Sequence, residues 1–228
     1  MTQNEIKQIL DRQRAFFHTG ATLDVSYRLD SLRRLRDCIT RHEADINKAL
    51  KKDLGKSAFE TYMCETGLVL NEISYMLKHT RSLQRKRVHT PLAQFHSRSY
   101  RKPSPYGVCL IMSPWNYPFL LTIDPLIDAI AAGNTAVIKP SAYSSYTSAL
   151  IQKMIHECFA PEYVSVVTGG RTENTCLLNE RFDYIFFTGS QSVGKEVMRQ
   201  AATHLTPVTL NSAGKVPVFR KTANLKLA

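Results

Sequence analysis

The sequence predicts an α/β protein with an N-terminal helical segment, an exposed hairpin and then a parallel sheet flanked by helices. Apolar residues recur at three- and four-residue steps before residue 80, which indicates amphipathic helices. From Pro105 onward, short β-rich runs alternate with helical stretches, the pattern of βαβ units. A chain of 228 residues with 43% hydrophobic content has enough apolar surface for one large domain, or one and a half.

Residues 1–87 are expected to form helices. Their apolar stripe consists of Leu29, Leu32, Leu35, Ile39, Ile46, Leu50 and Leu54. Gly55 follows this stripe as a C-cap, because glycine adopts the left-handed conformation without strain. Ser57 is placed to cap a second helix, which we expect to run through Met63 and Leu77 into the basic run RSLQRKR.

Residues 88–104 are expected to form an exposed hairpin of the oligomerisation type. The segment from Val88 to Lys102 is free of glycine, polar and loosely alternating, with Phe95 and Tyr100 among charged residues. Exposed strands present unpaired backbone groups and are stabilised by a partner edge. We therefore expect the chain to self-associate through this hairpin.

Residues 105–210 are expected to form a Rossmann-like parallel sheet. Its strand candidates are the runs VCLIM, TAVIK, VSVV and DYIFF. Gly133 precedes the second run, Gly169 and Gly170 follow the third, and Gly189 follows the fourth. Glycines at these places indicate the turns that join strands to helices in βαβ units.

The net charge of +11 is concentrated in the N-terminal half. Residues 1–102 carry 20 Lys and Arg against 11 Asp and Glu, a net of +9, and the rest of the chain carries +2. Such a charge favours nucleic acid or an anionic membrane. Because the basic runs lie among apolar residues at helical spacing, we interpret them as solvated helix faces. We expect no nucleic-acid partner, since the sequence has no aromatic RNA-binding motif or zinc-finger spacing.

The cysteines indicate a reducing compartment. Five are scattered along the chain without a CxxC pair, which predicts free thiols and no disulfide, zinc or other metal framework. No run approaches the roughly 18 apolar residues of a membrane span. The N-terminus lacks the layout of a signal peptide. Together these features predict a cytoplasmic protein.

Three motifs follow predicted strands and are expected to meet at one edge of the sheet. Ile111 to Asn116 follow the first strand, Lys139 to Ser141 the second, and Thr188 to Ser190 the fourth. Ligands of open parallel sheets bind beyond the carboxyl ends of the strands. The run from Thr188 also opens a helix, whose free N–H groups suit a phosphate.

With the run PWNYP, these motifs resemble those of NAD(P)-dependent aldehyde dehydrogenases. The segment from about Tyr100 to Leu210 is similar to that family motif by motif, and most similar to its short class 3 type. Residues 1–90 match the family's N-terminal helices less specifically. The resemblance implies NAD or NADP as cofactor and oxidation of an aldehyde to a carboxylic acid.

The resemblance also implies roles for individual residues. Asn116 matches the asparagine whose amide stabilises the oxyanion of the thiohemiacetal. The implied cofactor contacts are Ser113, Pro114 and Trp115 beside the nicotinamide, Lys139 at the adenosine ribose, Gly169 and Gly170 bordering that ribose, Thr188, Gly189 and Ser190 at the pyrophosphate, and Val193 at the adenine. Leu210, which matches the residue that precedes the general base, is a further implied cofactor contact.

The chain departs from the family at its catalytic residues. The family's general-base glutamate follows the leucine, but Asn211 stands there and an amide has no usable basicity. The chain ends at Ala228, before the family's nucleophilic cysteine, so we expect residues 211–228 to begin a truncated catalytic domain. Ala142 replaces a glutamate that binds the ribose hydroxyls in many members, which leaves NADP possible.

The run from Asn211 to Phe219 is open to a second interpretation. Deleting one base from a coding sequence for the family run Glu-Leu-Gly-Gly-Lys-Ser-Pro-Cys-Ile gives Asn-Ser-Ala-Gly-Lys-Val-Pro-Val and then begins a Phe codon. We interpret the missing glutamate as the result of such a frame shift, with ordinary divergence as the alternative.

The sequence therefore predicts the N-terminal, cofactor-binding half of an aldehyde dehydrogenase, inactive by itself. An aldehyde would be its substrate only if a catalytic domain completed it. A non-enzymatic oligomerisation or interaction fragment is the main alternative, and a basic nucleic-acid-binding protein is a weaker one.

Overall fold

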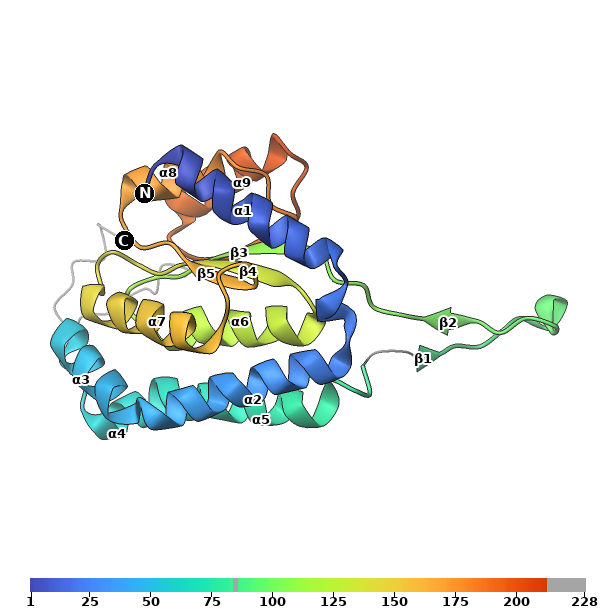
Figure 1. Cartoon of the computed structure of the whole chain (residues 1–228), viewed down its shortest axis with the longest axis horizontal. Coiled ribbons are helices and arrows are strands. Elements are labelled where there is room, and N and C mark those ends of the chain that lie inside the picture. The colour runs from blue at the N-terminus through green and yellow to red at the C-terminus, as the bar shows by residue number, and fades with distance from the viewer. Residues whose placement is uncertain (84–85, 213–228) are drawn as a thin grey trace, which may run out of the picture.

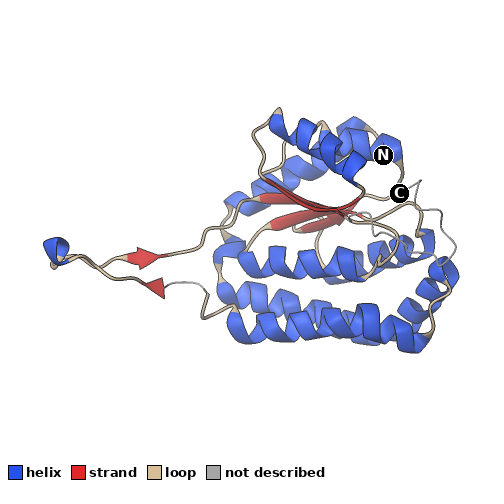
Figure 2. Cartoon of the chain, turned by 180° about the vertical axis from the view of Figure 1, so that it is seen from behind, coloured by secondary structure: helices blue, strands red, loops and turns tan. Residues whose placement is uncertain are grey.

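A five-stranded parallel sheet lies at the centre of the structure, a computed structural model that describes residues 1–83 and 86–212 (Figures 1 and 2). Its strands are β3 (Val108–Met112), β4 (Thr135–Lys139), β5 (Val164–Val166), β6 (Tyr184–Gly189) and β7 (Val208–Ser212). They run in the order β5-β4-β3-β6-β7, and every adjacent pair is parallel. The predicted α/β class is confirmed.

The strand order reverses at β3. The chain adds β4 and then β5 on one side of β3, and afterwards returns to add β6 and β7 on the other side. The loops that leave β3 and β6 therefore diverge at their carboxyl ends. This reversal is the place where open α/β sheets form a ligand crevice.

Helices cover both faces of the sheet (Figure 1). One face carries α6 (Leu120–Ala132) and α7 (Ser145–Cys158), and α2 (Val25–Arg41) and α5 (Gly67–His79) lie outside them as a further layer. The other face carries α1 (Gln3–His18), α8 (Arg171–Leu178) and α9 (Gln191–Ala202). A one-turn 3-10 helix, η1 (Ala21–Leu23), joins α1 to α2. Within the described residues, no helix has both the length and the apolar content to cross a membrane.

The predicted apolar stripe of the N-terminal helices faces the core. Leu32, Leu35 and Ile39 of α2 are buried, and they belong to the same hydrophobic cluster as buried residues of α6 and α7. Leu54 ends α3 (Glu43–Leu54), and Gly55 follows with a φ of 71°, the expected left-handed C-cap. The N-terminal helices are thus held by packing against α6 and α7, which cover the sheet, as their apolar periodicity indicates.

The second predicted helix is not one continuous element. Ser57 caps the short α4 (Ala58–Thr61) by accepting the Glu60 N–H at 3.1 Å, as expected. A π-helical turn, η2 (Tyr62–Thr66), then joins α4 to α5. The extra residue of a π turn shifts the helical register, and Met63, expected within the second helix, lies in this turn and is 55% exposed.

The hairpin projects away from the rest of the chain (Figures 1 and 2). Its strands β1 (Lys86–Arg87) and β2 (Tyr100–Arg101) are antiparallel and shorter than the alternating sequence predicts. A single backbone hydrogen bond, from Val88 N–H to Ser99 O at 3.1 Å, continues the pairing toward a 3-10 turn, η3 (Leu92–Gln94). The pairing begins at residue 86, two residues before the expected boundary.

The fifth strand, β7, is missing from the sequence-based prediction. Asn211 and Ser212 pair with Thr188 and Gly189 of β6, so the sheet extends two residues past the expected boundary at 210. The remainder of the predicted catalytic-domain segment, and most of the run interpreted as a frame shift, lies outside the described residues.

Candidate functional site

Two neighbouring cavities of about 790 Å³ each lie at the carboxyl edge of the sheet. One is lined by Lys139 and is called here the Lys139 cavity; the other is lined by Asn116 and is called the Asn116 cavity. Residues common to both linings are Ser113, Ser141, Tyr143, Phe187, Ser192 and Val193. Because these side chains border both spaces, the cavities form one crevice at the reversal point between β3 and β6.

Lys139 ends β4 and lies on the wall of the Lys139 cavity. The residue is 4% exposed, and its Nζ donates a hydrogen bond to the Pro140 carbonyl at 2.9 Å. Burial removes water from the ammonium group and lowers the pKa of Lys139 to about 8, and the charge of Glu173 partly opposes this shift. The cavity therefore contains a cation with unused donor capacity.

The Gly169–Gly170 loop forms another part of the same wall. Gly169 has a φ of 129°, and a Cβ placed there would lie 2.4 Å from the Glu173 carboxylate. That carboxylate accepts the Gly170 N–H at 2.8 Å and so fixes the loop at the start of α8. Glycine at position 169 allows the carboxylate to approach the backbone this closely.

The turn from β6 into α9 forms the floor of the Asn116 cavity. Ser190 is the N-cap of α9, and its Oγ accepts the Val193 N–H at 3.4 Å. Thr188 lines the cavity and is 9% exposed, and its hydroxyl has no hydrogen-bond partner. The N-terminus of a 12-residue helix and an unsatisfied buried hydroxyl together suit a polar, anionic ligand.

Asn116 is held in place by residues that the sequence did not single out. Lys56 Nζ donates to the Asn116 carbonyl at 3.1 Å and to Glu65 Oε1 at 2.5 Å. Glu65 Oε2 accepts the N–H groups of Phe119 and Leu120, at 2.8 and 3.1 Å, where α6 begins. Sequence patterns do not indicate this contact, because Lys56 lies in the charged run KKDLGK, which is typical of a solvated helix end.

The structure brings most of the predicted site residues to this crevice. Ser113, Pro114, Trp115, Asn116, Thr188, Gly189, Ser190, Val193 and Asn211 line the Asn116 cavity. Ser113, Lys139, Gly169, Gly170 and Val193 line the Lys139 cavity. Leu210 lines neither cavity and packs against the core cluster that includes Phe187 and Val197. The predicted contact of Leu210 with the cofactor therefore stays a prediction that the cavity linings do not support.

Several lining residues were not anticipated. They are Tyr143, Arg171, Asn174, Phe187, Gln191, Ser192 and Glu196. Tyr143 is 88% exposed, and Phe187 is buried beneath both cavities. Most of them lie within four residues of a predicted motif, which is the only signal that the sequence offered.

The cysteines lie elsewhere. All five are described and free, and none is among the residues that line the two cavities. Burial raises the pKa of Cys109 to about 12, with a smaller contribution from Asp183. That thiol is therefore protonated at neutral pH and is a poor nucleophile.

The sequence and fold can be compared with those of known proteins. The 4,4'-diaponeurosporen-aldehyde dehydrogenase of Staphylococcus aureus is 45% identical over 227 residues, which are 99% of this chain and 50% of that protein. The aldehyde dehydrogenase family 3 member A2 of Pongo abelii is 44% identical over 213 residues, 91% of this chain and 43% of its own length. The chain thus spans about half the length of these curated relatives.

Solved structures share the fold. Staphylococcus aureus AldH in a substrate-bound state has a TM-score of 0.92 and 45% identity, over 97% of this chain and 49% of that one. A betaine aldehyde dehydrogenase variant from Staphylococcus aureus, solved with NAD+, has a TM-score of 0.83 at 23% identity, over 93% of this chain and 44% of its own. The sequence profile of the aldehyde dehydrogenase family matches residues 1–228. The chain therefore belongs to the aldehyde dehydrogenase family.

Proposed function

We propose that this chain binds NAD+ or NADP+ along the crevice and is the cofactor-binding half of an aldehyde-oxidising dehydrogenase. The observation that carries the proposal is the continuity of the two cavities over the N-terminus of α9, at the reversal point of the sheet. A dinucleotide has two ends joined by a pyrophosphate, and this crevice has two cavities joined beside a helix N-terminus.

The adenosine end fits the Lys139 cavity. Lys139 would hold the ribose, the loop at Gly169 and Gly170 would border it, and Val193 would contact the adenine. The unsatisfied hydroxyl of Thr188 and the cap residue Ser190 would hold the pyrophosphate. These residues supply a cation, backbone donors and a hydroxyl, which is the donor set that a dinucleotide needs.

The nicotinamide end fits the Asn116 cavity, beside Ser113, Pro114 and Trp115. When bound, the nicotinamide ring supplies a hydride acceptor. The side-chain amide of Asn116 donates hydrogen bonds and would stabilise an oxyanion in the completed enzyme. Lys56 fixes the backbone of Asn116 and so limits how far that amide can move.

We infer that residues 1–228 do not oxidise aldehydes by themselves. Asn211 lines the cavity at the position of the general base, and its amide cannot accept a proton from water at neutral pH. None of the five described thiols borders either cavity. We propose aldehyde binding only for an enzyme completed by a catalytic domain, which would supply the remaining wall of the aldehyde pocket.

Both dinucleotides are expected to bind. Ala142 lines the Lys139 cavity without a carboxylate, and Lys139 and Arg171 are cations in the same lining. Glu196 is the acidic residue in that lining, and Arg199 forms an ion pair with it. The local charge therefore does not exclude the 2′-phosphate of NADP+.

Calorimetric titration of the purified chain with NAD+ and NADP+ tests the proposal. We expect both to bind weakly and Lys139→Ala to weaken both. Binding of NAD+ without NADP+, or unchanged binding after the substitution, would contradict the assignment. In a parallel assay with aliphatic and aromatic aldehydes we expect no NADH, and turnover abolished by mutating Cys158 or Cys176 would refute the inferred inactivity.

A second candidate role is self-association through the hairpin. Leu92 and Phe95 at its tip are 87% and 70% exposed. The hairpin strands β1 and β2 form a separate two-stranded sheet that projects from the rest of the chain (Figure 1). Apolar side chains on a projecting strand pair favour a protein partner. We propose that a second copy of the chain is that partner.

We also propose that the protein is cytoplasmic. The ground is that all five cysteines are free, including the neighbouring Cys38 and Cys158, and thiols persist in a reducing compartment. Cell fractionation with an antibody to the chain tests this, and recovery in an extracellular or periplasmic fraction would contradict it.

A further inference from the structure

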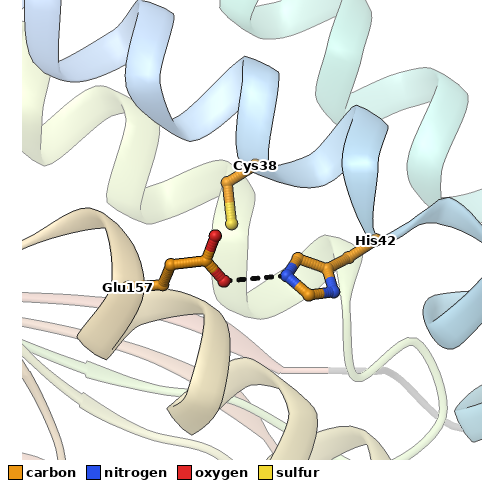
Figure 3. Close-up of side chains that lie close together, drawn as sticks. All are labelled: Cys38, His42 and Glu157. Atoms are coloured by element: carbon orange, nitrogen blue, oxygen red, sulfur yellow. Dashed lines mark hydrogen bonds and ion pairs between the residues drawn. The ribbon is translucent and has the colours of Figure 1, made fainter.

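A compact group of metal-ligand side chains lies away from the crevice, where α2 and α7 end (Figure 3). It consists of Cys38 near the end of α2, His42 between α2 and α3, and Glu157 near the end of α7. One ligand atom from each, the Cys38 Sγ, a His42 ring nitrogen and a Glu157 carboxylate oxygen, lies within 4.8 Å of the others. The cavities of the proposed nucleotide site include none of these residues.

His42 lies between two carboxylates. Its Nδ1 is 3.0 Å from Asp45 Oδ2, and its Nε2 is 2.9 Å from Glu157 Oε2. A neutral imidazole carries one N–H and satisfies only one of these contacts. The second contact therefore needs either a second proton on the ring or a cation between Nε2 and Glu157.

Asp45 determines which nitrogen would bind that cation. Histidines that bind metals usually donate their other ring N–H to a carboxylate, which fixes the tautomer. With Nδ1–H donated to Asp45, the Nε2 lone pair faces Glu157 and lies close to Cys38. The arrangement is that of a carboxylate–histidine–metal group.

Water can supply the fourth donor atom, because the Glu157 side chain is 37% exposed. Zinc bonds of about 2.0–2.3 Å in a tetrahedron place ligand atoms roughly 3.3–3.8 Å apart. Small side-chain rotations therefore suffice to form such a site from a cluster only 4.8 Å across.

Access and charge also fit a divalent ion. Cys38 is buried, whereas the Glu157 side chain is 37% exposed and opens the group to solvent. Arg41 contacts the other oxygen of Glu157, Oε1, at 2.7 Å, so Oε2 stays directed at His42. One thiolate and one carboxylate balance the two charges of the ion, and soft sulfur with imidazole favours zinc over magnesium or calcium.

We propose that Cys38, His42 and Glu157, with water as fourth ligand, bind one zinc ion that ties the end of α2 to the end of α7. Binding displaces the Cys38 thiol proton and any proton shared by His42 and Glu157. The sequence-based expectation of no metal site rested on the absence of CxxC spacing, and these ligands come from two helices 115 residues apart.

Cobalt(II) titration of the reduced full chain, with a non-chelating phosphine as reductant, tests the site. We expect one equivalent to bind with a thiolate-to-cobalt charge-transfer band, which stoichiometric zinc abolishes. Cys38→Ser and His42→Asn should each remove the band. Asp45→Asn should weaken binding about 10–100-fold, because it removes the partner of the ligand histidine.

Cys176→Ser is the matched control, since Cys176 packs with the cluster on the opposite face of the sheet. It should leave the band unchanged. The proposal is overturned if no charge-transfer band forms, or if the band persists in both Cys38→Ser and His42→Asn. It is also overturned if Cys176→Ser removes the band. If circular dichroism shows that Cys38→Ser fails to fold, His42→Asn and Glu157→Gln decide, because their partly exposed side chains are more tolerant of change.

Discussion

The ammonium group of Lys56 lies 2.5 Å from Glu65 Oε1 in the protein interior, with the two side chains 8% and 0% exposed. The same ammonium contacts the carbonyl of Asn116, and the same carboxylate caps α6 through Phe119 and Leu120. A buried ion pair between the α3–α4 connection and η2 therefore fixes the loop that carries the predicted oxyanion residue.

Breaking this pair from one side should destabilise the chain strongly. Glu65→Gln leaves Lys56 buried without its counter-charge, which costs about 3–5 kcal/mol. Lys56→Met together with Glu65→Gln should cost less than Glu65→Gln alone, because no unpaired charge remains. Urea unfolding measures both, with Lys51→Met as the exposed control that stays within about 0.5 kcal/mol of the wild type. Equal stability of Glu65→Gln and the wild type would refute the buried pair.

Two glycines near Phe187 should respond oppositely to alanine. A Cβ at Gly189 would lie 2.6 Å from the Phe187 ring, which must move under both cavities, so Gly189→Ala should cost about 1–3 kcal/mol and weaken NAD+ binding. A Cβ at Gly194 would lie 3.5 Å from the same ring. Gly194→Ala should therefore stabilise α9 by about 0.5–1 kcal/mol. Thermal melts and calorimetry test both, and a stabilising Gly189→Ala would contradict the packing described.

The preference for NADP+ over NAD+ should fall as pH rises. Because burial lowers the pKa of Lys139 to about 8, its ammonium is charged at pH 7 and loses its charge above pH 8. The 2′-phosphate, with a second pKa near about 6, stays ionised throughout this range. The dissociation constant of NADP+ divided by that of NAD+, measured between about pH 7 and about pH 10, should therefore rise. Lys139→Met should abolish this pH dependence. A pH dependence that remains in Lys139→Met would come from another titratable group and would contradict the assignment.

Polar substitutions at the hairpin tip should reduce self-association. Leu92→Ser with Phe95→Ser removes the two large exposed apolar side chains of the tip. Sedimentation velocity should show a shift toward monomer, whereas Leu205→Ser, at a residue 91% exposed on the α9–β7 loop, should have no effect. An unchanged distribution in the double variant would argue against the hairpin as the contact.

The sequence predicted those parts of the fold that local patterns encode. Leu32, Leu35 and Ile39 have helical spacing and are buried, and Gly55 adopts its predicted cap conformation. The strand β7 was missed because VTLNS is half polar, so its pairing with β6 depends on tertiary contacts and not on its own pattern.

The same division applies to the site. Motifs at strand ends predicted Lys139 and Thr188, since parallel strands bring their carboxyl ends together. Lys56 and Glu65 were not predicted to support the site, because a lysine in a charged run is expected to be solvated. Only the fold shows that Lys56 is buried. The pairing of His42 with Glu157 likewise spans 115 residues, beyond the reach of any local pattern.

Mapping of backbone amide shifts by NMR, on the chain titrated with NAD+, tests the central claim most directly. The proposed crevice predicts perturbations concentrated in residues 113–116, 139–143, 169–171 and 188–193, which border the two cavities. Titration with AMP should perturb the last three of these groups and spare the loop at Asn116. Saturating NAD+ that leaves these amides unmoved, or that perturbs only the hairpin and the helices at its base, would contradict the claim that this crevice binds the dinucleotide.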